Sequence, residues 1–172
     1  MSKNHVVRAI DPDVVAQLRA CDDAGFRRLV VTREDGGAPL RCCLRRSEPD
    51  ERIMLVSYAP LRRWAAETGA SPGAYDECGP VFVHAEVCPG PSSGTAYPLE
   101  LHGERRVFRA YSADGRILGG TFLQDPGNPG SDVEGALDDV FADPEVALVH
   151  VRAVEFGCFL LEVRRADKHS AA

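Results

Sequence analysis

The sequence predicts an α+β fold in which a mainly antiparallel sheet carries two or three helices packed on one face. Many short segments alternate between apolar and polar residues, several are joined by hairpin-type turns, and the helical patterns lie far apart in the chain. A doubly wound nucleotide fold needs strict alternation of strands and helices and a glycine-rich phosphate loop, and neither pattern is present. We therefore expect one domain over residues 1–172, with a flexible tail at 166–172.

Two segments have clear helical signals. Residues 10–26 begin with Asp11 as N-cap and Pro12 at the first helical position. Residues 131–145 begin with Ser131 and Glu134, the spacing of a capping box. A third segment is a short helix or only a turn, and it covers residues 61–69.

Eight further segments have the β-branched and aromatic composition of strands. Two of them join at Asp114–Gly115, a favoured hairpin dipeptide. The expected strands lie within residues 26–34, 39–46, 52–60, 79–88, 105–113, 115–124, 146–154 and 158–165.

Composition narrows the range of partners. Apolar residues make up 44% of the chain and charged residues 27%, which is typical of a globular protein. The net charge of -6 argues against a nucleic-acid partner, because phosphate binding normally needs a basic face. No apolar run approaches the roughly 18 residues of a membrane span. The first residues contain no apolar signal core, so we expect a cytoplasmic protein whose six cysteines stay reduced.

The stretch GPVFVHAEVCPG, residues 79–90, concentrates reactive side chains on one predicted face. Strand alternation places Val81, Val83, Ala85 and Val87 on the core and Phe82, His84, Glu86 and Cys88 opposite. The same sorting of residues 39–46 turns Leu40, Cys42 and Leu44 inward and Arg41, Cys43 and Arg45 outward. An ordinary solvated face is the simplest explanation, but thiols, imidazoles and arginines are more typical of a polar pocket.

These segments resemble the bacterial domain-of-unknown-function 1203 family. The resemblance rests on a P-x-R-x-C-L strand, a G-P-[IV]-F-x-H-A-x-x-C strand, an R-x-Y strand and a closing V-R-x-x-x-x-G-C-F segment. The matching residues are Pro39, Arg41, Cys43, Leu44, Gly79, Pro80, Phe82, His84, Ala85, Cys88, Arg109, Tyr111, Val151, Arg152, Gly157, Cys158 and Phe159. The match covers about residues 25–165. The family often carries histidine where this chain has Cys42, and the resemblance implies no particular activity.

Our first hypothesis is a pocket that binds a small anionic organic molecule, and the sequence leaves open whether the molecule is also chemically transformed. Arginines bind carboxylate or phosphate through paired hydrogen bonds, and a thiol beside such cations becomes nucleophilic. The expected catalytic residues are His84, Cys43 and Cys88. The expected ligand-binding residues are Arg41, Arg109, Tyr111, Arg152, Glu86 and Cys158. This hypothesis requires the three arginines and His84 to converge on one cavity.

A zinc site is a weaker alternative, formed by Cys43, His84, Cys88 and Cys158. Atoms that bind one zinc ion lie within roughly 4 Å of each other. In an extended strand, however, His84 and Cys88 are four residues and therefore roughly 13 Å apart. They can share a metal only if the strand breaks before Pro89. The chain also lacks a C-x-x-C pair, so we expect no metal and no cofactor.

A third hypothesis is a non-catalytic protein-interaction module. Aromatic residues dominate the energetics of many interfaces, and Trp64, Tyr75 and Tyr97 fall in or near predicted loops. Trp64 is equally compatible with a core position. A homodimer is compatible with the sequence, but no segment specifies one.

Overall fold

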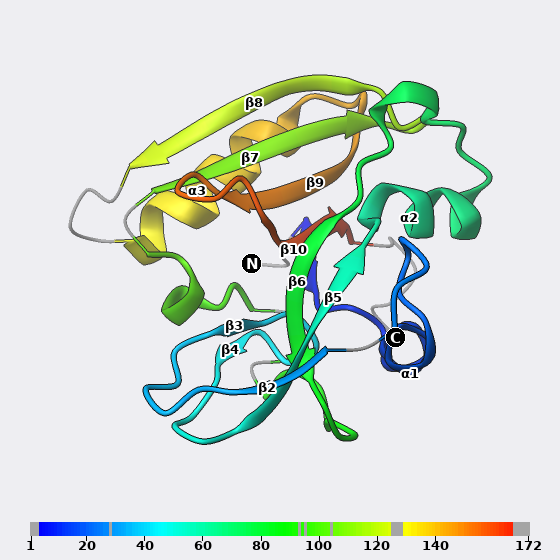
Figure 1. The fold of residues 1–172 in the computed structure, drawn as a ribbon. Helices are drawn as coiled ribbons and strands as arrows, with labels where there is room; N and C mark the ends of the chain where they lie inside the picture. Colours follow the sequence, from blue (N-terminus) through cyan, green and yellow to red (C-terminus); the bar gives the residue numbers. More distant parts are fainter. Residues whose placement is uncertain are drawn as a thin grey trace, which may run out of the picture.

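The chain forms two five-stranded sheets (Figure 1). The computed structural model describes residues 4–27, 29–92, 94, 96–103, 105–124 and 129–166. The first sheet has the order β1 (His5–Arg8), β10 (Phe159–Arg165), β9 (Val146–Ala153), β7 (Arg105–Ser112) and β8 (Ile117–Gln124). The second has the order β2 (Leu29–Thr32), β5 (Arg52–Tyr58), β6 (Gly79–His84), β3 (Pro39–Leu40) and β4 (Arg45–Arg46). All pairings are antiparallel except that of β3 with β6.

Three α-helices and two short 3-10 helices complete the described part of the chain. The α-helices are α1 (Pro12–Ala20), α2 (Pro60–Thr68) and α3 (Pro129–Ala142). The 3-10 helices are η1 (Gly73–Tyr75) and η2 (Leu99–Leu101). The α+β class and the mainly antiparallel pairing predicted from the sequence are confirmed. The strands, however, divide between two sheets.

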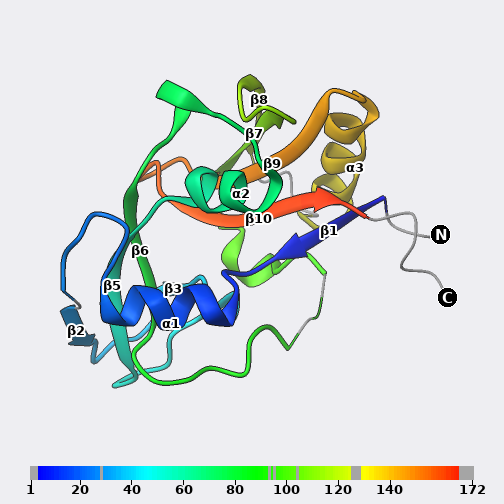
Figure 2. The same cartoon turned by 90° about the vertical axis from the view of Figure 1, so that its right-hand side faces the viewer.

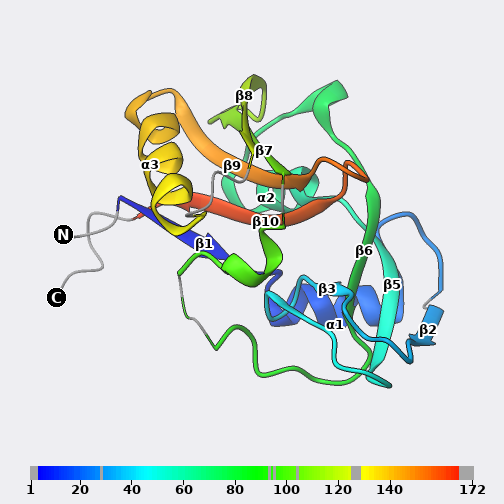
Figure 3. The same ribbon diagram turned by 90° about the vertical axis from the view of Figure 1, so that its left-hand side faces the viewer.

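The helices cover different faces, as the two side views show (Figures 2 and 3). On one face of the first sheet, Leu137 of α3 packs into a cluster with Phe108 and Val149. On the other face, Trp64 of α2 packs with Leu148. Strand β9 is therefore buried on both sides, because helices lie above and below it. Helix α1 packs instead on the second sheet, where Leu18, Ile53 and Val83 share a core.

Local signals at two helix starts had different outcomes. Asp11 caps α1 as predicted, since its carboxylate accepts a hydrogen bond of 2.8 Å from the backbone N–H of Asp13. Helix α3 starts at Pro129, so Ser131 lies inside the helix and is not its N-cap. Residues 61–69 do form a helix, which ends at Gly69 in the left-handed conformation with φ 80°.

The β7–β8 hairpin turns at Asp114–Gly115 as predicted, with Gly115 at φ 85°. Within the described residues, no helix has the length and hydropathy that a bilayer crossing needs. The predicted flexible tail lies outside the described residues from 167 onward.

Candidate thiol and histidine site

A tight turn at residues 41–44 replaces the single strand predicted over 39–46. Strand β3 ends at Leu40, and the backbone N–H of Leu44 donates to the Leu40 carbonyl at 2.9 Å. Leu44 has φ 57°, in the left-handed region. Alternation therefore fails here, and both Cys42 and Cys43 are buried. Cys42 packs inward as expected, but the expectation that Cys43 faces outward was wrong, because the strand stops before it.

Strand β6 ends at His84, four residues earlier than Cys88. Val81, Val83 and Ala85 face the core as predicted, but Val87 is 92% exposed because the chain has already left the sheet. The chain then bends, and the backbone N–H of Gly90 donates to Cys88 Sγ at 3.4 Å. This bend removes the separation of roughly 13 Å expected for an extended chain.

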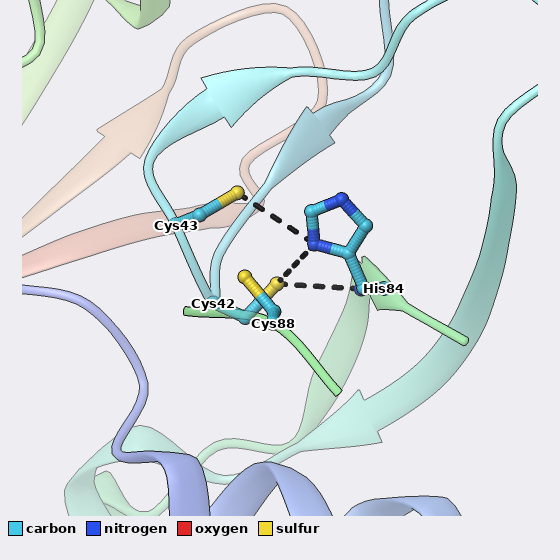
Figure 4. A group of neighbouring side chains, drawn as sticks. All are labelled: Cys42, Cys43, His84 and Cys88. Atoms are coloured by element: carbon cyan, nitrogen blue, oxygen red, sulfur yellow. Dashed lines mark hydrogen bonds between the residues drawn. The ribbon is translucent and has the colours of Figure 1, made fainter. Parts of the chain in front are cut away.

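The turn and the strand end bring four side chains together, as Figure 4 shows. Cys42 Sγ lies 3.2 Å from His84 Nδ1, and Cys43 Sγ lies 3.7 Å from the same nitrogen. With Cys88 Sγ added, all four ligand atoms lie within 4.8 Å of one another. We call Cys42, Cys43, His84 and Cys88 the thiol–histidine cluster. Cys158 does not belong to it, although the zinc hypothesis from the sequence included it.

Glu51 orients the imidazole. His84 Nε2 lies 2.6 Å from Glu51 Oε1, which can only accept, and 2.9 Å from Arg45 Nη2, which can only donate; the shorter contact, with Glu51, assigns the proton to Nε2. Nδ1, on the side of the thiols, is then the ring nitrogen with a free lone pair in neutral His84. Arg45 holds Glu51 through two hydrogen bonds of 2.6 and 3.0 Å. The contact with Arg45 lowers the pKa of Glu51 to about 2.

Each sulfur atom in the cluster accepts a backbone N–H. The donors are His84 for Cys42, Arg45 for Cys43 and Gly90 for Cys88. Hydrogen bonds of this kind stabilise a thiolate. The contact with Cys42 lowers the pKa of Cys43, and the same shared proton raises that of Cys42. Burial raises the pKa of Cys88. Hydrogen bonding to Cys43 raises the pKa of His84.

A cavity of about 420 Å³ lies beside the cluster. Cys43, His84 and Cys88, the predicted catalytic residues, line it together with the predicted ligand-binding residue Glu86. Two cationic side chains, those of Arg45 and Arg52, also line the cavity. Arg52 binds Glu86 at 2.6 Å. We call this space the thiol cavity.

The other predicted ligand-binding residues lie elsewhere. Arg109 and Arg152 both bind Glu77, and Tyr111 is buried beside Arg109. Arg152 and Cys158 line a separate cavity of about 400 Å³. Arg41 is buried and donates to the Phe159 carbonyl at 2.8 Å. The arginines therefore do not meet His84 in one cavity, because Arg152 lies near Gly79 and Pro80 at the start of β6, whereas His84 lies at the end of that strand.

Sequence reasoning missed three residues of this site: Cys42, Arg45 and Glu51. Cys42 was assigned to the core by strand alternation. Glu51 stands in a polar turn with no motif around it, and only the fold brings it to His84, 33 positions away. The aromatic side chains considered as interface anchors differ in exposure: Trp64 and Tyr97 are buried, while Tyr75 is 42% exposed.

One family model, described as "Protein of unknown function (DUF1203)", matches residues 37–165. This range contains all four residues of the thiol–histidine cluster as well as Glu51. No curated protein and no solved structure matches the chain.

Because β6 ends at His84, Val83 and Val87 should contribute differently to the free energy of unfolding. Val83→Ala should lower the free energy of unfolding by about 2 kcal/mol, because Val83 is 0% exposed. Val87→Ala should change it by less than about 0.5 kcal/mol, because Val87 is 92% exposed. Urea unfolding measures both. Equal losses from the two variants would mean that the strand continues to Val87.

Proposed function

The chain belongs to the DUF1203 family of proteins of unknown function, and we propose that it is a metal-binding protein that holds a zinc ion in the thiol–histidine cluster. The observation that carries this proposal is the set of three sulfur atoms and one imidazole nitrogen within 4.8 Å of one another. Three thiolates and one histidine are a common ligand set of structural zinc.

The distances support a tetrahedral site. Ligand atoms around one zinc ion lie within roughly 4 Å of each other, since the Zn–S and Zn–N bonds are about 2.3 and 2.0 Å long. The cluster needs to contract by less than about 1 Å to reach that geometry. All four residues lie in a turn, at a strand end or in a bend, outside the interior of any helix or strand.

The surroundings of the cluster also suit a metal. Zinc-bound histidine usually donates its second N–H to a carboxylate, which fixes the ring orientation, and Glu51 is placed to accept it. The three sulfur atoms already accept backbone N–H groups, and such donors stabilise thiolate charge. One zinc and three thiolates carry a net charge of −1, and the guanidinium of Arg45, paired with Glu51, lies beside the site.

A metal-free thiol site is the second candidate function, and one arrangement favours it. Glu51, His84 and Cys43 stand in a row, with distances of 2.6 Å from Glu51 to Nε2 and 3.7 Å from Nδ1 to the sulfur. A carboxylate, an imidazole and a thiol in this order can activate the sulfur as a nucleophile. The thiol cavity with Arg45 and Arg52 would then receive a small anionic molecule. A resident zinc ion excludes this chemistry, because it occupies Cys43 and His84.

Metal content decides between the two candidates. We expect the protein purified without chelators to contain about one zinc per chain by elemental analysis. Cobalt substitution should give the visible absorption of a tetrahedral site together with a thiolate-to-cobalt charge-transfer band. Cys42→Ser, Cys43→Ser, Cys88→Ser and His84→Ala should each lose the metal. Cys21→Ser, Cys78→Ser and Cys158→Ser are matched controls that should retain it.

Metal loss in Cys158→Ser with retention in Cys42→Ser would contradict the cluster and favour the ligand set expected from the sequence. Absence of zinc, combined with failure of the protein to bind added zinc or cobalt, would reject the metal proposal. The metal-free candidate would then predict that iodoacetamide labels Cys43 faster than the exposed Cys21, and that His84→Ala removes the difference.

A second prediction concerns Glu51. Glu51→Gln should weaken zinc binding by roughly 10- to 100-fold, because an amide is a poorer acceptor for the His84 N–H and loses the pairing with Arg45. Competition with a chromophoric zinc chelator measures the affinity. Glu86→Gln is the control: Glu86 lines the same cavity but pairs with Arg52, so its affinity should match wild type.

A further inference from the structure

A second cavity, of about 400 Å³, lies where the start of β6 meets the turn between β9 and β10. Its walls include Tyr58, Glu77, Arg152, Phe156, Cys158 and Phe159. We call it the arginine cavity. Its volume is within the range of about 300–1,000 Å³ that is usual for small-molecule sites. None of the residues of the thiol–histidine cluster lines it.

Two arginines share the carboxylate of Glu77, and one of them, Arg152, lines the cavity together with Glu77. Arg109 of β7 and Arg152 of β9 each place a guanidinium nitrogen 2.9 Å from Glu77 Oε2. The two strands are neighbours, and the pairing of Val107 with Arg152 sets Arg109 two positions away on the adjacent strand. Two positive charges thus meet one negative charge, which leaves one cation in excess.

A third cationic side chain, that of Arg41, lies behind Phe159 in the wall of the arginine cavity. Its side chain is 3% exposed, and its Nε donates to the carbonyl of Phe159, which lines the cavity. Among the described residues no carboxylate lies within ion-pair distance of Arg41. Burial lowers its pKa to about 10, so the guanidinium remains charged at neutral pH. A buried cation without a counter-ion favours an anion nearby.

Glu77 has the features of a replaceable partner. It lies between η1 and β6, outside any helix or strand, and its side chain is 47% exposed. Paired guanidinium groups match the planar geometry of a carboxylate, whether it comes from the chain or from a ligand.

We propose that the arginine cavity binds a small organic acid, whose carboxylate replaces that of Glu77 on Arg109 and Arg152. The apolar or aromatic part of this ligand lies against the rings of the cavity, Tyr58, Phe156 and Phe159. Phe156 is 84% exposed, and such a ligand would cover it. This site is independent of the metal proposal, because the two groups of residues do not overlap.

Phenylacetate and phenylacetamide test the proposal, since they differ in charge and are close in shape. We expect calorimetric titration of the full chain to show binding of phenylacetate at least about 10-fold tighter than that of the neutral amide. Backbone NMR signals of residues 156–159 should shift with the acid. Equal binding of the two probes, or absence of binding by both, overturns the proposal. Binding should persist in Cys88→Ser, which separates this result from that of the metal site.

Two charge variants then test the role of Glu77. Arg152→Gln should weaken phenylacetate binding by about 10-fold or more, whereas the exposed Arg33→Gln should leave it unchanged. Glu77→Gln should strengthen binding by roughly 2- to 5-fold, because it removes the competing carboxylate. Glu34→Gln is its control for the change in net charge. Weaker binding in Glu77→Gln would overturn the replacement of Glu77 by the ligand, and circular dichroism checks that each variant is folded.

Discussion

The parallel contact between β3 and β6 is the constraint on which the candidate metal site depends. It pairs Leu40 with Phe82, and the backbone N–H of Arg41 then donates to the Phe82 carbonyl at 2.9 Å. The segments after β3 and β6 both leave the sheet within a few residues of this pairing. Because the register is fixed there, the turn after Leu40 and the end of β6 at His84 must lie side by side. The pairing of β6 with β5, which sets His84 opposite Ile53, fixes the face on which the His84 side chain lies.

Backbone N–H groups and the Arg45–Glu51 ion pair surround the thiol–histidine cluster. Residues in turns and at strand ends have N–H groups that no neighbouring strand uses, and here these groups point at the sulfur atoms of Cys42, Cys43 and Cys88. Arg45 and Glu51 then set the orientation of His84 from the far side of the ring. The arrangement places thiolate-stabilising donors on one side of the imidazole and the Arg45–Glu51 ion pair on the other.

Sequence patterns predicted most elements because they depend on local signals. The Asp11 cap, the Asp114–Gly115 hairpin and the core face of β6 up to Ala85 all follow from spacing within a few residues. The site could be predicted only in part. His84, Cys43 and Cys88, the catalytic residues predicted from the sequence, all line one cavity, while their chemical role stays a prediction. Cys42 joins them only because β3 ends at Leu40 and β6 ends at His84. Strand alternation does not predict where a strand ends.

The prediction that the arginines and His84 share a cavity failed for a related reason. Alternation identifies the face of a strand but not which residues of other strands lie beside each part of it. The start of β6, at Gly79 and Pro80, lines the arginine cavity with Arg152, whereas His84 at its end lines the thiol cavity. The turn at 41–44 nevertheless touches both regions. It supplies Cys42 and Cys43 to the thiol–histidine cluster, and it sends Arg41 to the Phe159 carbonyl at the wall of the arginine cavity. One short turn therefore borders both candidate sites, although the cluster and the arginine cavity share no residue.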